Sequence, residues 1–275
     1  MTDKLRIGVA ALSWMLWSCL TCSTVLLVSG CATTMTGANM NSDRVTESDE
    51  PEARKRARLR LELAVAYFDK GQTTDALDHL KQSITADPTL FEAYNLRGLI
   101  YMRLNDIPLS EESFRRALAI NPKAATVQHN YGWLLCQQSR FSESTQLFNS
   151  ALAEPTYGER AKTWMAQGLC QMKANQLTEA ENSFLRSYEL DAGNPITAYN
   201  LSQLLYQRSE FVRAQFYVRR LNNSELANAE SLWLGIKVER RIENRDATAQ
   251  LSAQLRKRYP QSRENLALER GAFNE

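Results

Sequence analysis

The sequence is poor in the residues that catalytic and metal sites most often use. Its 275 residues include only two histidines, His79 and His129, and 11 glycines. The H-E-x-x-H zinc motif, the glycine-rich phosphate loop and the G-x-S-x-G nucleophile motif are all missing. We therefore expect a binding protein that needs no cofactor and no metal. The alternative is an enzyme built from dispersed Asp and Glu residues, which would lose activity when these are replaced.

A strong excess of charge of one sign is also missing. The chain has 33 basic and 31 acidic residues, a formal net charge of +2. This is too neutral for general binding to nucleic acid, so no such partner is expected. Proline is scarce, with seven residues, whereas Ala, Leu, Glu, Arg and Gln are abundant. This composition favours an all-α protein.

The longest apolar run is at the N-terminus. Lys4 and Arg6 precede a segment from Ile7 to Val28 that is broken only by Gly, Ser, Thr and Cys. This pattern is typical of a secretory signal peptide, over residues 1–30. The run is also long enough to cross a bilayer, so an uncleaved anchor is the alternative.

The end of this run, Val28-Ser29-Gly30-Cys31, resembles the bacterial lipobox. The resemblance implies that Cys31 is acylated and anchors the chain in a membrane, where each buried CH₂ contributes about 0.8 kcal/mol. In such lipoproteins the residue after the acylated cysteine decides the membrane to which the protein is sorted. Ala32, rather than Asp, follows Cys31, so the resemblance implies the outer membrane of a Gram-negative bacterium, at its periplasmic face. Residues 31–53 contain almost no large apolar side chains, and we expect a flexible tether there.

The rest of the chain repeats itself. A small residue within an apolar helical segment recurs at spacings of 34, 34, 36, 34 and 33 residues, at Ala64, Gly98, Gly132, Gly168, Ser202 and Gly235. A second small residue follows after twelve positions, at Ala76, Ser110, Ser144, Ala180, Ala214 and Ala247. A bulky apolar residue follows four positions later, at Leu80, Phe114, Phe148, Phe184, Val218 and Leu251. Most units close with a proline, which disfavours helix before it, at Pro88, Pro122, Pro155, Pro195 and Pro260.

This pattern resembles the tetratricopeptide repeat (TPR), six times over residues 54–261. The resemblance implies an all-α, right-handed superhelix of helix-turn-helix units, an α-α solenoid. Residues 262–275 are expected to form a polar cap, because the end of a solenoid must be soluble.

In a TPR superhelix the first helix of each repeat lines the concave face. The register of the repeats predicts an apolar groove there that would suit an amphipathic or extended peptide. Its residues are Leu61, Val65, Phe68, Asn95, Leu99, Met102, His129 and Trp133. The alternative for each of them is a place in the core between repeats.

Two cysteines remain once the signal peptide and Cys31 are set aside. Cys136 and Cys170 lie on the first helices of repeats three and four, at similar heights. Export would place them in an oxidising compartment, so we expect a disulfide that locks the two repeats together. Two buried free thiols are the alternative.

The first helix opens with a basic run over residues 54–60. A solvated face is one interpretation of this run. The other is a contact with acidic lipid headgroups or an acidic partner.

Several phrases give a narrower resemblance: AYNLRGLIYMRLND (93–106), HNYGWLLCQQSRFSES (129–144) and GLCQMKANQLTEAENSFLRS (168–187). They resemble the PilW/PilF family of type IV pilus biogenesis lipoproteins, over essentially the whole chain. Repeat one departs from the pattern, with Ala64 in place of glycine.

That resemblance implies a pilotin, a monomer that binds the pilus secretin and promotes its localisation and multimerisation in the outer membrane. A TPR lipoprotein that recruits peptidoglycan enzymes is the alternative.

Overall fold

The computed structural model describes residues 50–273. The expected signal peptide, the lipidation site Cys31 and most of the expected tether lie outside these residues. Within 50–273 every regular element is a helix, and no strand is present. The helices are α1 (Glu52–Asp69), α2 (Thr73–Ala86), α3 (Phe91–Arg103), α4 (Ile107–Ile120), α5 (Ala125–Gln137), α6 (Phe141–Ala153), α7 (Arg160–Lys173), α8 (Leu177–Leu190), α9 (Pro195–Gln207), α10 (Phe211–Asn222), α11 (Ala229–Arg241), α12 (Arg245–Arg258) and α13 (Arg263–Glu269).

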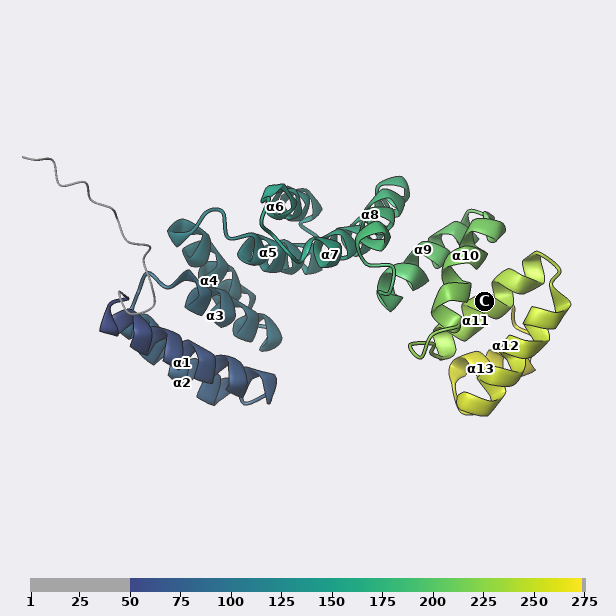
Figure 1. Cartoon of the computed structure of the whole chain (residues 1–275), viewed down its shortest axis with the longest axis horizontal. Helices are drawn as coiled ribbons and strands as arrows, with labels where there is room; N and C mark the ends of the chain where they lie inside the picture. The colour runs from purple at the N-terminus through teal and green to yellow at the C-terminus, as the bar shows by residue number, and fades with distance from the viewer. Residues whose placement is uncertain (1–49, 274–275) are drawn as a thin grey trace, which may run out of the picture. The chain divides into compact units, whose positions relative to one another are not determined.

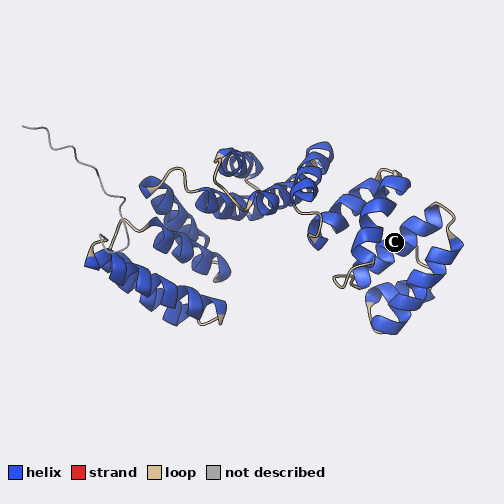
Figure 2. Cartoon of the chain, in the orientation of Figure 1, coloured by secondary structure: helices blue, strands red, loops and turns tan. Residues whose placement is uncertain are grey.

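The helices pair in chain order into six hairpins, from α1–α2 to α11–α12, joined by short loops (Figures 1 and 2). The second helix of each hairpin packs on the first helix of the next. The first helices of successive hairpins also contact one another, whereas among the described residues the second helices do not. This is the nearest-neighbour packing of an α-α solenoid. The predicted fold class is therefore correct.

The turn inside each hairpin needs one residue with positive φ. Five of the six are not glycine, with φ between 58° and 62°. The residues are Gly71, Asn105, Ser139, Asn175, Ser209 and Glu243. Glycine and asparagine adopt this left-handed conformation at the lowest cost, which suits three of the six positions.

These turns give spacings of 34, 34, 36, 34 and 34 residues. The predicted spacing of 33 for the last repeat is therefore wrong by one residue. In repeat six Ile236, not Gly235, corresponds to Gly98 and Gly132. Ser252, not Leu251, then corresponds to Phe114 and Phe148.

With the register corrected, each hairpin buries one complementary pair of side chains sixteen residues apart. The pairs are Ala64 and Leu80, Gly98 and Phe114, Gly132 and Phe148, Gly168 and Phe184, Ser202 and Val218, and Ile236 and Ser252, all buried. Where the first helix has the smallest residue, the second helix has the largest, and repeat six reverses the arrangement. The two helices can pack closely only if a large side chain on one is matched by a small side chain on the other.

The boundaries differ slightly from those expected. Glu52 and Ala53 belong to α1 rather than to the tether. Pro195 does not close a repeat: it is the first residue of α9, and Asn194 caps this helix by accepting a hydrogen bond from the Thr197 amide at 3.0 Å. Proline suits the first helical position because the amide there has no partner within the helix.

After the sixth hairpin, α13 covers the end of the array. Ser262 caps it by accepting a hydrogen bond from the Asn265 amide at 3.1 Å. Its apolar side contributes Leu268 to a cluster with Leu232 and Ile236 of α11. The C-terminal cap therefore has an apolar inner side as well as the expected polar outer one.

Candidate functional site

The candidate surface is the inner face of the array, formed by the first helices α1, α3, α5, α7, α9 and α11. In repeat one, Val65 is 41% exposed, while Leu61 and Phe68 are half-buried against the neighbouring core. The Arg103 guanidinium lies 5.3 Å from the centre of the Phe68 ring and donates a hydrogen bond to the Phe68 carbonyl at 3.2 Å. We call the surface formed by Leu61, Val65 and Phe68 the aliphatic surface of repeat one. Arg103, from the next repeat, lies at its Phe68 end.

Repeat two contributes a half-buried trio to the same face. Leu99 and Met102 pack at the edge of the cluster around Phe114. The amide of Asn130 donates a hydrogen bond to Asn95 Oδ1 at 3.0 Å, which joins α3 to α5. This hydrogen bond ties repeat two to repeat three, beside the half-buried side chains of Leu99 and Met102.

In repeat three, His129 lies in the packing between repeats rather than on an open surface. It is 6% exposed, and its Nδ1 is 2.8 Å from Thr163 Oγ1, which also contacts the Tyr157 hydroxyl at 2.9 Å. Burial, together with the charge of Lys162, lowers the pKa of His129 to about 4. The imidazole is consequently neutral at neutral pH.

Trp133 is half-buried on the same helix, with the Lys173 ammonium 5.9 Å from its ring.

The first repeat has a further apolar surface that was not predicted from the sequence. Leu59 is 58% exposed and Leu63 is 37% exposed on α1. The residues equivalent to Leu59 in repeats two and three are Ala93 and Val127, and both are fully buried against the preceding hairpin. Because no described hairpin precedes α1, this face is uncovered. The repeat position of Leu59, combined with its place in the first repeat, is the signal that could have found it.

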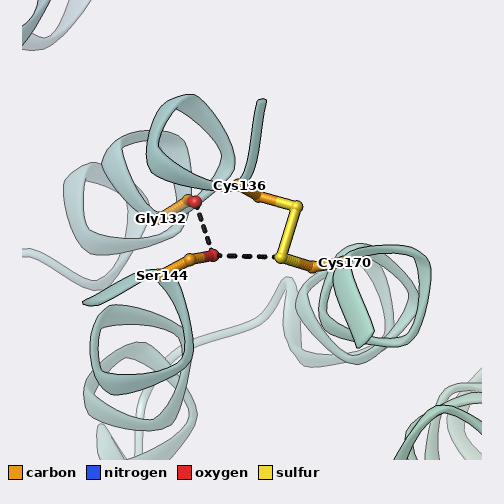
Figure 3. Close-up of a disulfide and its surroundings, with 4 residues drawn as sticks. All are labelled: Gly132, Cys136, Ser144 and Cys170. Atoms are coloured by element: carbon orange, nitrogen blue, oxygen red, sulfur yellow. Dashed lines mark hydrogen bonds between the residues drawn. A yellow bond between two sulfur atoms is a disulfide. The ribbon is translucent and has the colours of Figure 1, made fainter. Parts of the chain in front are cut away.

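Cys136 of α5 and Cys170 of α7 are joined in a disulfide, with their Cα atoms 5.7 Å apart (Figure 3). Both are buried, at 0% and 2% exposure. The Ser144 hydroxyl donates to the Gly132 carbonyl at 2.7 Å and lies 3.4 Å from Cys170 Sγ. The bond therefore crosses from repeat three to repeat four inside the packed layer.

The basic run at the start of α1 is largely paired. Arg54 Nε is 2.7 Å from Asp87, Arg58 Nε is 3.0 Å from Glu50, and Lys55 Nζ is 3.0 Å from Glu52. Their basic side chains are 39%, 54% and 38% exposed, and ion pairs made by such exposed side chains contribute little to stability. They also reduce the charge available to an acidic surface.

Two other properties bear on the kind of site. Within residues 50–273, no three His, Cys, Asp or Glu side chains are grouped so that they could hold a metal ion. None of the helices in this part of the chain is long and apolar enough to cross a membrane.

Further along the inner face, repeats five and six form a cavity of about 490 Å³ lined in part by Tyr199, Tyr206 and Trp233. This site was not predicted from the sequence. The predicted groove named residues of repeats one to three only, although Tyr199 and, in the corrected register, Trp233 occupy the repeat position of Leu61, Asn95 and His129.

Comparison with known proteins agrees with this architecture. Three family models of the tetratricopeptide repeat match this chain, over residues 65–105, 91–124 and 132–195. The type IV pilus assembly protein PilF of Pseudomonas aeruginosa is 29% identical over 239 residues, which cover 87% of this chain and 93% of PilF.

Two solved structures extend the comparison. The structure of Pseudomonas aeruginosa PilF superimposes with a TM-score of 0.73 at 28% identity, covering 80% of this chain and 100% of that one. The crystal structure of PilW, a widely conserved type IV pilus biogenesis factor, gives 0.68 at 29% identity, covering 77% of this chain and 97% of that one.

The chain therefore contains tetratricopeptide repeats, which build its helical array. Among proteins with such repeats it is a homologue of PilF and PilW, and it matches nearly their whole lengths.

Proposed function

We propose that the chain is an outer-membrane lipoprotein that acts as a pilotin in type IV pilus biogenesis. It would bind the pilus secretin and promote its localisation and multimerisation. The observation that carries this proposal is the match to PilF and PilW over nearly their full lengths. The aliphatic surface of the first repeats supplies a site for an apolar segment of the partner.

The mechanism we propose is physical and requires no catalytic step. Acyl chains on Cys31 would hold the protein at the membrane. A tether of some twenty residues would reach about 25 Å, at roughly 5–6 Å × √n. The inner face of repeats one to three would hold one secretin segment, so that membrane residence and binding together raise the local concentration of secretin monomers. The chain would act as a monomer.

The test is the state of the secretin in a strain that lacks this protein. We expect the heat-stable secretin multimer, seen on an unheated denaturing gel after membrane fractionation, to vanish or to move to the inner membrane. The wild-type gene should restore it, and Cys31→Ala should restore it less well.

An unchanged multimer in its usual membrane would refute the pilotin proposal. A protein that instead co-purified with peptidoglycan synthases or hydrolases would be an adaptor for those enzymes. A truncated chain without repeats one to three that still bound the secretin normally would move the binding site elsewhere on the protein.

A further inference from the structure

Two cavities adjoin at the C-terminal end of the inner face. The cavity of about 490 Å³ described above lies between α9, α11 and α13. A second cavity of about 350 Å³ is lined in part by Ile196 and Leu226. Tyr199 and Glu230 line both cavities, so the two meet at these residues, and together they are called the groove below.

The second cavity is apolar and open. Ile196 is 47% exposed and Leu226 is 55% exposed. The residues equivalent to Ile196 in the other five repeats are all polar or charged, namely Arg58, Glu92, Thr126, Lys162 and Glu230. A large aliphatic side chain therefore replaces a solvated one in this repeat alone. Exposed apolar surface confined to a groove is the usual mark of a binding site.

The charges along the groove are separated. Glu230 and Glu264 line the larger cavity, and within residues 50–273 neither forms an ion pair with a basic side chain. Burial, together with these two carboxylates, raises the pKa of Tyr199, so both glutamates act on the same point of the groove.

The opposite charge lies further along. The Lys237 ammonium is 5.6 Å from the centre of the Tyr206 ring and 5.7 Å from that of Trp233. It occupies the ring faces at that end, where a second cation would be repelled. A ligand cation is therefore directed to the end with Glu230 and Glu264, next to the apolar cavity.

We propose that this groove is a second peptide-binding site. It would take an extended segment that places a large aliphatic side chain between Ile196 and Leu226 and a neighbouring Lys or Arg side chain at Glu230 and Glu264. Complementary charge selects such a segment over an acidic one. The aromatic ring of Tyr199 adds a surface suited to the arginine or lysine stem. This acidic site differs in chemistry from the aliphatic surface of repeat one, and it does not depend on whether that surface binds a secretin.

The test begins with a library of random heptapeptides displayed on phage. The library is selected for binding to the mature protein, purified from the cells that produce it from the full-length gene. We expect enriched peptides to carry a large aliphatic residue within about two positions of Lys or Arg. A synthetic peptide of the enriched sequence should bind at least tenfold more weakly to the double variant Glu230→Gln, Glu264→Gln. It should also bind more weakly as salt rises, since salt screens exposed charges.

The charge-reversed variant Glu230→Lys, Glu264→Lys provides the decisive control. It should lose the original peptide and gain affinity for the version in which Glu replaces the basic residue. Val65→Asp, in repeat one, should leave binding unchanged. Circular dichroism and the melting temperature should match the wild-type values in all variants, because the substituted side chains are not buried.

The proposal would be overturned by enriched peptides that lack a basic residue, by unchanged binding to the Gln variants, or by no enrichment above a target-free control. None of these results would bear on the pilotin proposal, whose test concerns the secretin multimer and the first three repeats.

Discussion

Gly98 and Phe114 are packed so closely that no side chain fits between them. A Cβ atom on Gly98 would come within 2.6 Å of Phe114 Cε1. A Cβ atom on Gly132 would lie 3.0 Å from the Phe148 ring, and one on Gly168 would lie 2.7 Å from the Phe184 ring. The central repeats therefore bring their two helices together on a glycine, and the opposing ring fills the volume.

Gly98→Ala should consequently lower the free energy of unfolding by about 1–3 kcal/mol, because the new methyl group overpacks the contact. Phe114→Leu alone should also destabilise the fold, by leaving a cavity. The double variant should recover part of the loss, since repeat one uses Ala64 with Leu80. Denaturant unfolding of the four proteins forms a double-mutant cycle. Purely additive losses would contradict the pairing.

The bond between Cys136 and Cys170 closes a segment with a sequence separation of 34. The chain-entropy model predicts that Cys136→Ala, Cys170→Ala lowers the free energy of unfolding by about 3–4 kcal/mol. Guanidinium unfolding without reductant measures this loss, and wild-type protein reduced in denaturant should behave like the variant. Identical midpoints with and without the bond would show that it contributes nothing to stability.

His129 should make stability depend on pH. Its pKa is about 4 in the folded chain and about 6.5 in the unfolded chain. Between these values the unfolded state binds more protons than the folded state, so lowering the pH favours unfolding. The free energy of unfolding should fall by about 1–2 kcal/mol between pH 6.5 and 5. His129→Gln should remove this slope, whereas His79→Gln, at the other histidine, should keep it. A slope that survives in His129→Gln would mean that another group is responsible.

The aliphatic surface of repeat one should be required for the partner and not for the fold. Val65→Asp places a charge on the exposed inner face, where an apolar segment would have to desolvate it. We expect secretin multimers to decrease at least tenfold in cells, with an unchanged melting temperature. Leu190→Asp, at a residue that is 57% exposed on α8, is the matched control and should leave multimers unchanged. Equal effects of the two variants would argue against a specific surface.

Much of this architecture could be predicted because the repeat imposes the same packing requirement six times. A small residue opposite a bulky one, at a constant spacing, leaves few alternatives to stacked hairpins. The last repeat could not be placed correctly, because Ile236 and Ser252 meet the same requirement with the sizes reversed. Gly235, one position earlier, does face Leu251, since a Cβ atom there would lie 3.1 Å from Leu251 Cδ1, but the turn at Glu243 places it one residue off the register of the other repeats.

The inner face was harder to predict for a different reason. Leu61, Val65 and Phe68 follow one another at helical spacing on α1, yet only Val65 is exposed. His129 shares the repeat position of Leu61 but is buried by Thr163 and Tyr157, which come from the next repeat and from the loop before it. Whether a residue lines a groove or is buried between two repeats depends on the side chains that neighbouring segments place against it. The repeat register alone does not specify those side chains.

The disulfide also sets how far the array can open at one time. Each hairpin is held only by its neighbours, so unfolding can begin at either end and proceed one repeat at a time. Repeats three and four, at the centre, are the only pair among the described residues that share a covalent bond. Fraying that starts at either end is therefore expected to stop at this central pair, so that amide hydrogen exchange would be slowest in α5 and α7 and would rise toward both ends.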